Sequence, residues 1–240
     1  MKITFIGTSH GIPERDRKCS SAIIRIGDRS YFVDMGTQSI EWLRVNDVPV
    51  ESVKAVFVTH MHGDHVNGLP SFLDLCNWFF TGAEPKIFMP SKEGADALVG
   101  WVIALEKRAY RGIEVNTVTE GVIFDDGFLK VTAYRTQHCR NSFAYLLESD
   151  GKRVLFTGDL QSPAVDFPLK ALEKRLDVLI CESAHFDPNC YTELFKDHDV
   201  GSVYFNHIQP RRIPILEELT ESLRETVPAQ IAYDGLEIHL

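Results

Sequence analysis

One segment, residues 56–65, constrains the fold and the chemistry of this chain more than any other. It reads Val-Phe-Val-Thr-His-Met-His-Gly-Asp-His, so an apolar strand runs straight into the pattern H-x-H-x-D-H. Alternate side chains of a strand share a face, so His60 and His62 point the same way, and the following turn can bring Asp64 and His65 back toward them. Neutral imidazoles and a carboxylate are ligands that suit Zn²⁺, and also Mn²⁺ or Fe²⁺.

This spacing seldom arises by chance. With nine His in 240 residues, random placement would produce it in roughly one chain in a thousand. The alternative interpretation is a polar turn whose histidines merely face solvent. We disfavour it because ligand-type side chains crowded into so short a segment would repel one another, or lack hydrogen-bond partners, without a cation.

Three further ligand candidates each follow a predicted strand by a few residues. They are His138 after residues 129–134, Asp159 after residues 153–157, and His207 after residues 202–206. Taken singly, each is explained as well by a loop histidine or a capping aspartate. Together with the first segment they supply enough ligands for two metal ions, so we predict a dinuclear site.

Strand-like runs rich in β-branched and aromatic residues are interspersed with helical periodicity. Strands are predicted at residues 3–6, 22–26, 31–34, 55–59, 86–89, 129–134, 143–147, 153–157, 178–181, 202–206 and 236–240. Helices are predicted at residues 37–45, 69–80, 95–105, 168–175, 191–196 and 214–225. Two β-rich halves covered by helices describe this order better than a regular βαβ alternation. We therefore predict a mixed α/β architecture, with residues 1–240 forming a single domain.

Composition excludes several classes of function. The formal net charge is −9, which disfavours a protein that coats nucleic acid, because binding to phosphates needs clustered cations. No apolar run reaches the roughly 18 residues of a membrane span, and the first residues turn polar too early for a signal peptide, so we expect a cytoplasmic protein. The five cysteines form no C-x-x-C pair, and we expect them to be buried apolar residues rather than a disulfide framework or a thiolate zinc site.

Four segments together resemble one known superfamily. Residues 7–13 (Gly-Thr-Ser-His-Gly-Ile-Pro), 31–36 (Tyr-Phe-Val-Asp-Met-Gly), 59–65 with the following Gly-Leu-Pro at 68–70, and 234–238 (Asp-Gly-Leu-Glu-Ile) are similar to motifs of the metallo-β-lactamase-fold hydrolases. Within that superfamily the chain resembles the branch of RNase Z and the small phosphodiesterases, over essentially its whole length. The resemblance implies an αβ/βα four-layer sandwich with the site at one edge of its two sheets.

The resemblance also assigns roles to residues at matching positions. It implies that one metal ion binds His60, His62 and His138, that the other binds Asp64, His65 and His207, and that Asp159 bridges them. A hydroxide held between the two ions would be the nucleophile, because two dications pull its pKa toward neutrality. Asp64 would orient this hydroxide as well as ligate. Asp34 would hydrogen-bond a ligand histidine from behind and fix its tautomer, although a strand-end aspartate capping the next helix explains it equally well.

A leaving alkoxide needs a proton, and His185 is our candidate for the acid that supplies it. It follows the predicted strand 178–181, and phosphodiesterases of this fold resemble this chain in having an acid histidine at a similar offset. A solvent-exposed loop histidine is the alternative. The segment 181–184 (Cys-Glu-Ser-Ala) departs from the H-E-A-T segment of true RNase Z, since Cys181 stands where that family has a catalytic histidine.

The substrate is predicted to be a small anionic ester. His138 and Asp159 are too close in sequence for the arm with which RNase Z grips tRNA, and the negative charge also disfavours a large structured RNA. Arg140, Arg211 and Arg212 follow predicted ligands and could bind a phosphate, but each could equally be a solvated surface charge.

Several functional hypotheses stay open at this point. The leading one is a dinuclear metal-dependent phosphodiesterase acting on a small nucleotide-like or cyclic phosphodiester. The alternatives are a lactonase or other carboxyl-ester hydrolase, an RNase Z-like ribonuclease, and a non-catalytic metal-binding protein. The sequence favours zinc without identifying the metal, and it leaves open whether the chain forms a homodimer.

Overall fold

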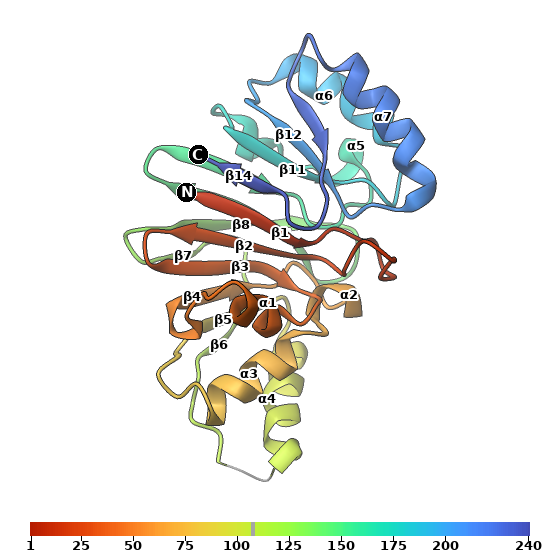
Figure 1. The fold of residues 1–240 in the computed structure, drawn as a ribbon. Coiled ribbons are helices and arrows are strands. Elements are labelled where there is room, and N and C mark those ends of the chain that lie inside the picture. The colour runs from red at the N-terminus through yellow and green to blue at the C-terminus, as the bar shows by residue number, and fades with distance from the viewer. Residues whose placement is uncertain (107–108) are drawn as a thin grey trace.

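Two β-sheets form the middle of the molecule in a computed structural model that describes residues 1–106 and 109–240. In these residues each sheet has seven strands, and Figure 1 shows them stacked between two groups of helices. The first sheet has the order β14 (Glu237–His239), β1 (Lys2–Gly7), β2 (Ser21–Ile26), β3 (Arg29–Met35), β4 (Val53–Phe57), β5 (Lys86–Met89) and β6 (Val115–Thr117). The second has the order β13 (Ala229–Ile231), β12 (Val203–Asn206), β11 (Val178–Glu182), β10 (Lys152–Phe156), β9 (Ser142–Ser149), β8 (Lys130–Thr136) and β7 (Gly121–Asp125).

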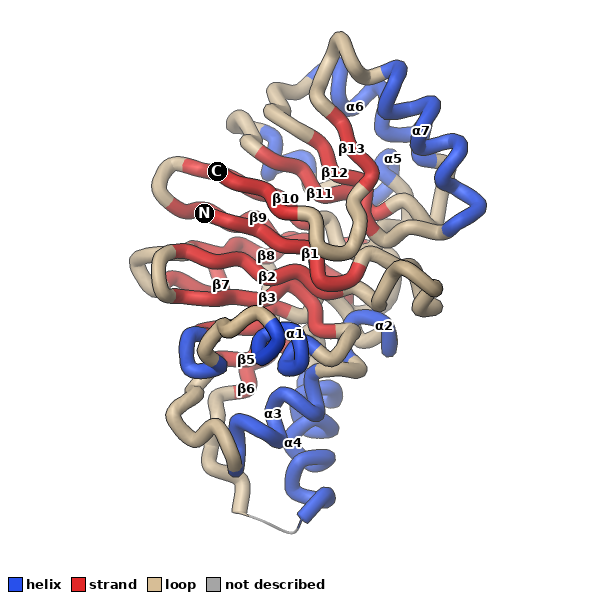
Figure 2. Tube along the Cα trace, viewed as in Figure 1, coloured by secondary structure: helices blue, strands red, loops and turns tan. Residues whose placement is uncertain are grey.

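Helices cover the outer face of each sheet, as the tube view in Figure 2 makes plain. The helices of the amino-terminal half are α1 (Ser39–Val45), α2 (Gly63–Val66), α3 (Leu69–Trp78) and α4 (Lys92–Glu106). Those of the carboxy-terminal half are α5 (Pro163–Asp166), α6 (Thr192–Asp197) and α7 (Ile213–Ser222). Short 3₁₀ turns occupy Val50–Ser52, Leu169–Leu172, Pro188–Tyr191 and Pro210–Arg212.

Strand alternation divides the core into three layers. In β3, Tyr31 and Val33 face the other sheet, whereas Phe32 faces the helices α1, α3 and α4. In β10, Val154 faces the first sheet while Leu155 packs toward α6 and α7. Both faces of these strands are buried, which explains why they read as continuous apolar runs rather than as alternating patterns. The order of layers is helix, sheet, sheet, helix, as the family resemblance implies.

The sheets share a topology that brings strand ends together. Along the chain, the first strands of each sheet pair antiparallel and the later ones pair parallel. The parallel strands run from β3 to β6 in the first sheet and from β10 to β13 in the second. The carboxyl ends of parallel strands lie at one edge of a sheet, and the loops that leave this edge are where side chains from several strands can converge.

The elements differ from the sequence prediction in a few places. The three-residue strands β6 and β13, and the strand β7, were not predicted, because they are short and mostly half-buried or exposed and so carry no apolar run. The predicted helix at 168–175 is only a 3₁₀ turn at Leu169–Leu172. The predicted strand at 55–59 ends at Phe57, because the Thr59 amide donates to the Asp34 carboxylate instead of to a neighbouring strand.

The cysteines follow the prediction only in part. Cys76 and Cys181 are buried, but Cys19 and Cys139 are half-buried and Cys190 is exposed. Over the described residues, the helices are each too short or too polar to cross a membrane.

Candidate metal centre

The loops at the shared edge of the two sheets bring all seven predicted ligands into one cluster. The segment after β4 carries four of them, and β8, β10 and β12 each lead into one more. Because β4 lies in the first sheet and the other three strands in the second, the cluster joins the two sheets.

Three histidines and one aspartate form the first group of this cluster. His60 Nε2 lies 2.9 Å from His62 Nδ1, and His138 Nε2 lies 3.2 Å from the same atom. The Oδ2 atom of Asp159 lies 3.5 Å from His60 Nε2 and 3.6 Å from His138 Nε2. Each residue therefore directs one donor atom toward a common point.

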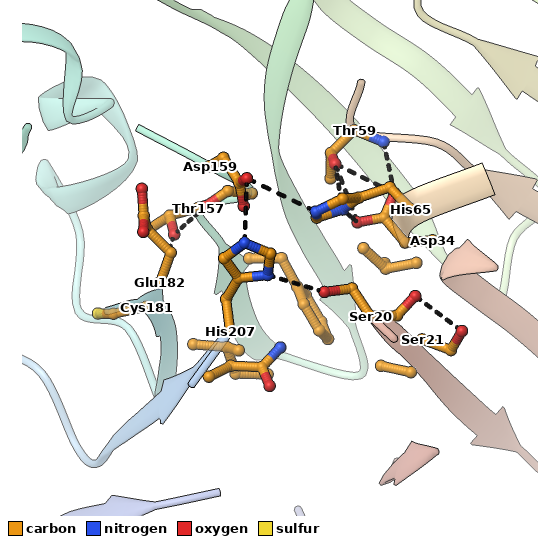
Figure 3. A pocket seen from close by; sticks show the side chains of 16 residues that line it. Ser20, Ser21, Asp34, Thr59, His65, Thr157, Asp159, Cys181, Glu182 and His207 are labelled. Atoms are coloured by element: carbon orange, nitrogen blue, oxygen red, sulfur yellow. Dashed lines mark hydrogen bonds and ion pairs between the residues drawn. The ribbon is translucent and has the colours of Figure 1, made fainter. Parts of the chain in front are cut away.

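The second group uses the same oxygen of Asp159. His65 Nε2 lies 3.2 Å from Asp64 Oδ2 and 3.6 Å from Asp159 Oδ2. His207 Nε2 lies 3.3 Å from Asp159 Oδ2 and 3.8 Å from Asp64 Oδ2. Asp159 thus stands between the two groups, as Figure 3 shows for its contacts with His65 and His207.

These separations fit two tetrahedral metal positions. Donor atoms about 2.0–2.1 Å from a tetrahedral Zn²⁺ lie about 3.3 Å from one another, which is in the middle of the observed distances. His65 Nε2 gives further support, because this buried atom faces the oxygens of Asp64 and Asp159 but makes no well-aligned hydrogen bond within the described residues. A buried polar atom without a partner is costly, and a cation at this point would satisfy it.

The protonation of the cluster is also that of a ligand set. Burial lowers the pKa of His60 to about 2 and that of His207 to about 4, so both rings are neutral at physiological pH. Burial alone would raise the pKa of Asp159, but the neighbouring His207 and His65 hold it well below its ordinary value. Burial would lower the pKa of His65, but the charges of Asp159 and Asp34 raise it, so the surroundings of this ring favour a positive charge.

Groups behind the ligands hold the rings in position. Asp34 Oδ2 lies 2.7 Å from His65 Nδ1, as the family resemblance implies, and the same carboxylate accepts the amide and hydroxyl of Thr59. The Thr59 hydroxyl also lies 3.1 Å from His60 Nδ1. Ser20 Oγ lies 3.0 Å from His207 Nδ1. Outer partners of this kind fix the tautomer of a ligating histidine.

Two of these residues have a backbone conformation that favours glycine. The φ angle is +57° at Asp34 and +56° at His207. A non-glycine residue in the left-handed region is strained by roughly 1–3 kcal/mol, and such strain persists where the surroundings hold the residue in place and is common at functional sites.

His185 lies at the open side of the cluster. Its Nδ1 atom is 3.0 Å from Glu182 Oε2 and 3.8 Å from Asp159 Oδ2. Its ring stacks on that of His207. Burial would lower the pKa of His185, but the hydrogen bond and charge of Glu182, together with the charge of Asp159, raise it. Glu182 is itself buried and accepts the backbone amides of Leu160, Ala184 and His185.

Asp166 connects two of the ligand loops. Its Oδ2 atom accepts the amide of Gln137, next to His138, at 2.7 Å and that of Gln161, two residues after Asp159, at 3.0 Å. Its Oδ1 atom accepts the amide of Ser162 at 3.1 Å. This buried carboxylate therefore sets the spacing between the two loops.

The cluster reaches solvent at three of its histidines. His62 and His185 are exposed and His138 is half-buried, whereas the remaining ligands are buried. A substrate would therefore approach past these three histidines.

The three arginines considered above are arranged differently from one another. Arg140 is exposed, and Arg211 is exposed with its Nε donating to Gln209. Arg212 is half-buried, and its Nε has no hydrogen-bond partner within the described part of the chain. Their part in substrate binding stays a prediction.

Four residues that support the site were not predicted from the sequence: Ser20, Thr59, Glu182 and Asp166. Thr59 and Glu182 lie next to or within the motifs already singled out, so their position was a usable signal. Ser20 and Asp166 act across distant parts of the chain, and nothing in their local sequence marks them.

The chain is similar to a known family and to several curated proteins. The family described as anti-Pycsar protein Apyc1 matches residues 1–192. A ribonuclease Z from Thermosynechococcus vestitus is 33% identical over 150 residues, which are 60% of this chain and 36% of that protein. A ribonuclease BN from Cronobacter sakazakii is 32% identical over 158 residues, which are 63% of this chain and 51% of that protein. The chain thus spans between about a third and a half of the length of these curated relatives.

Solved structures with the same architecture cover the whole chain. The short form of human tRNase Z has a TM-score of 0.74 at 18% identity and covers 100% of this chain and 99% of its own. The metallo-β-lactamase fold protein YhfI from Bacillus subtilis has a TM-score of 0.72 at 20% identity, with 99% and 98% covered. A diphosphatase of the PhnP family has a TM-score of 0.69 at 18% identity, with 100% and 97% covered. These likenesses confirm the predicted metallo-β-lactamase fold.

Proposed function

The chain belongs to the family of the anti-Pycsar protein Apyc1, and from this premise and the geometry of its histidine and aspartate cluster we propose that it is a metal-dependent hydrolase. Its substrate is a small nucleotide-like or cyclic phosphodiester. One observation carries the proposal: seven donor atoms converge in two groups that share Asp159 Oδ2, with separations suited to a pair of cations.

The residues of the two groups would hold two divalent metal ions, with zinc favoured by the imidazole-rich donor set. When bound, such ions neutralise the charge of a phosphodiester and lower the pKa of a water molecule, so that it can attack at neutral pH. Asp64 contributes an oriented negative charge beside this point. Burial would raise the pKa of Asp64, but the neighbouring His65 and His207 lower it to about 2, so the carboxylate is ionised and can accept a hydrogen bond from the attacking water.

His185 is proposed to protonate the leaving alkoxide. The Glu182 carboxylate faces its Nδ1 atom, which leaves Nε2 as the nitrogen free to donate. Burial would lower the pKa of His185, but Glu182 and Asp159 raise it, so this ring holds a proton to higher pH than a free imidazole does. A general acid whose pKa is near the working pH is the most effective.

The loops around the site support a small substrate. Between His138 and Asp159 the chain makes only the hairpin of β9 and β10, which turns through Asp150 and Gly151. The structure describes every residue between His138 and Asp159, and no additional arm that could grip a folded RNA is present there. The formal charge of −9 adds repulsion toward a polyanion. A cytoplasmic location stays a prediction from the sequence.

An RNase Z-like ribonuclease is the second candidate, because curated relatives about a third identical to this chain carry that name. The two candidates differ in the substrate that the cluster accepts. The assay therefore needs both a small phosphodiester and a structured RNA.

The test measures metal content and hydrolysis on the same preparation. Purified protein should contain two zinc-type ions per chain and should hydrolyse bis-p-nitrophenyl phosphate and cyclic nucleotides, and removal of the metal with a chelator should abolish both activities. His62→Ala and Asp159→Ala should lower metal content, while His239→Ala, at an exposed position, should not. Full activity in the metal-free protein would overturn the mechanism, and cleavage of structured RNA alone would favour the ribonuclease.

A further inference from the structure

His207 is the ligand whose position depends most on a distant part of the chain. It follows β12 in the second sheet, and its backbone has a φ angle of +56°. Its ring lies between those of His65 and His185, at centroid distances of 5.1 Å and 5.4 Å. These contacts limit how the ring can tilt, but they do not decide which of its two nitrogens carries the proton.

Ser20 supplies a contact that can decide this. It lies just before β2 in the first sheet, and its hydroxyl oxygen is 3.0 Å from His207 Nδ1 (Figure 3). The same hydroxyl can donate to the carbonyl of Ser9, at 3.5 Å. A hydroxyl that donates to a carbonyl has lone pairs left to accept from the imidazole N–H. Both side chains are buried, so no bulk water competes for these positions.

The other nitrogen of the ring faces a competing acceptor. His207 Nε2 lies 3.3 Å from Asp159 Oδ2, so in the metal-free protein a proton on Nε2 would be attracted to that carboxylate. A proton there occupies the lone pair that a cation needs. The Ser20 hydroxyl stabilises the opposite tautomer, with the proton on Nδ1 and Nε2 free.

The amino-terminal loop fixes Ser20 relative to His207. Ile208, the residue after His207, donates its amide to the carbonyl of Thr8 at 2.7 Å, and the amide of His10 donates to the carbonyl of Ile208 at 3.2 Å. The loop is tied in turn to Asp234, which accepts the amides of Thr8 and Lys18 at 2.9 Å and 2.7 Å. The position of Ser20 is therefore set by contacts independent of the cluster.

We infer that Ser20 is a positioning residue that selects the metal-binding tautomer of His207. The inference rests on the proposed function, since it concerns the same cluster. It also makes the two halves of the cluster unequal. The position formed by Asp64, His65 and His207 depends on the amino-terminal loop, whereas the position formed by His60, His62 and His138 does not.

The test compares zinc binding in matched variants. Metal-free protein is titrated with Zn²⁺ against a chromophoric chelator, which resolves the affinities of the two equivalents. Ser20→Ala should weaken one equivalent roughly 10–100-fold and leave the other unchanged. Ser20→Thr retains the hydroxyl, so it should restore binding. Ser30→Ala removes a buried serine hydroxyl far from the cluster and should change neither equivalent.

A second measurement reads the tautomer itself. Long-range ¹H–¹⁵N spectra of the metal-free protein should show His207 protonated at Nδ1 in the wild type and in Ser20→Thr, and at Nε2 in Ser20→Ala. If Ser20→Ala does not fold, Ser20→Cys keeps the volume and replaces a strong acceptor with a weak one, so the same shift is expected.

Three results would overturn the inference: wild-type zinc binding in folded Ser20→Ala, equal weakening of both equivalents, or an unchanged tautomer. Failure of the proposed function gives a different pattern. If wild-type protein bound two zinc ions in a Ser20-dependent way but hydrolysed no phosphodiester, only the function would fall. If it bound no zinc, the function would fall and the spectra of the metal-free protein would still decide the role of Ser20.

Discussion

Asp166 allows a quantitative test of how the ligand loops are held together. Replacing it with Asn keeps the shape of the side chain but leaves one acceptor oxygen and introduces an amide donor. If the remaining oxygen keeps the amides of Gln137 and Gln161, the new NH₂ group faces the amide of Ser162, which at present donates to Oδ1 over 3.1 Å. One hydrogen bond is then replaced by a contact between two donors, and the other two hydrogen bonds have a neutral acceptor instead of a charged one.

The expected cost follows from these three bonds. A hydrogen bond to a charged group contributes about 1.5–3 kcal/mol and a neutral one about 1 kcal/mol. Losing one bond costs about 1.5–3 kcal/mol and weakening two costs about 0.5–2 kcal/mol each, so the free energy of unfolding falls by about 2.5–7 kcal/mol. For a chain of this size that corresponds to a fall in Tm of roughly 5–28 °C. Because the loops carry His138 and Asp159, we also expect weaker zinc binding.

The assay is thermal unfolding of metal-free Asp166→Asn, followed by circular dichroism, with zinc affinity measured on the same samples. Asp150→Asn is the matched control, because Asp150 is exposed at the turn between β9 and β10 and its φ angle of +47° suits Asn. A Tm for Asp166→Asn within about 2 °C of that control, equivalent to less than about 1 kcal/mol, would refute the reasoning.

Three further predictions concern other parts of the molecule. Gly36→Ala should destabilise the protein by about 3 kcal/mol or more and reduce zinc content, because a Cβ atom there would lie 1.7 Å from the backbone oxygen of Asp64; wild-type zinc content would contradict this. His185→Gln should slow turnover of alkyl phosphodiesters about 10²-fold or more but change nitrophenyl esters little, since only a poor leaving group needs a proton; equal losses in the kinetics of the two would argue against an acid role. Burial would raise the pKa of Asp126, but the amides of Leu129 and Phe128 and the hydroxyl of Tyr31 lower it. The ionised Asp126 carboxylate therefore adds about 1–2 kcal/mol to the free energy of unfolding. This contribution is present above about pH 4 and is lost as the pH falls through the lowered pKa of the folded state. Urea unfolding of Asp126→Asn should accordingly differ from wild type at pH 7 and differ less at pH 3, and a gap that does not narrow would show the sign to be wrong.

Much of the fold could be predicted from the sequence, because strands that are buried on both faces are recognisable as apolar segments. Strands such as β3 and β10 are continuous apolar runs, and α3 has an apolar repeat, so each was found within a few residues. The three-residue strands β6 and β13 were missed because they are held by pairing with a neighbour already in place, and pairing leaves no trace in their own residues. The turn at Leu169–Leu172 reads as a helix locally, but it closes after four residues.

The candidate site divides in the same way. His60, His62, Asp64 and His65 are recognisable because their chemistry is concentrated in one short segment, and strand ends pointed to His138, Asp159 and His207. Ser20 and Asp166 could not be found, because a serine before a strand and an aspartate in a short helix are common. Their roles come only from partners 187 and 29 residues away in sequence.

Because the donor atoms come from both sheets, their separations depend on how the two sheets are aligned. The donor separations lie between 2.9 Å and 3.8 Å, whereas sliding one sheet past the other by a single residue would move a donor about 3.3 Å. Keeping the donor atoms in place therefore requires a more precise alignment of the two sheets than folding alone requires. Substitutions that loosen this interior, even far from the histidines, should release metal at temperatures where the chain is still folded.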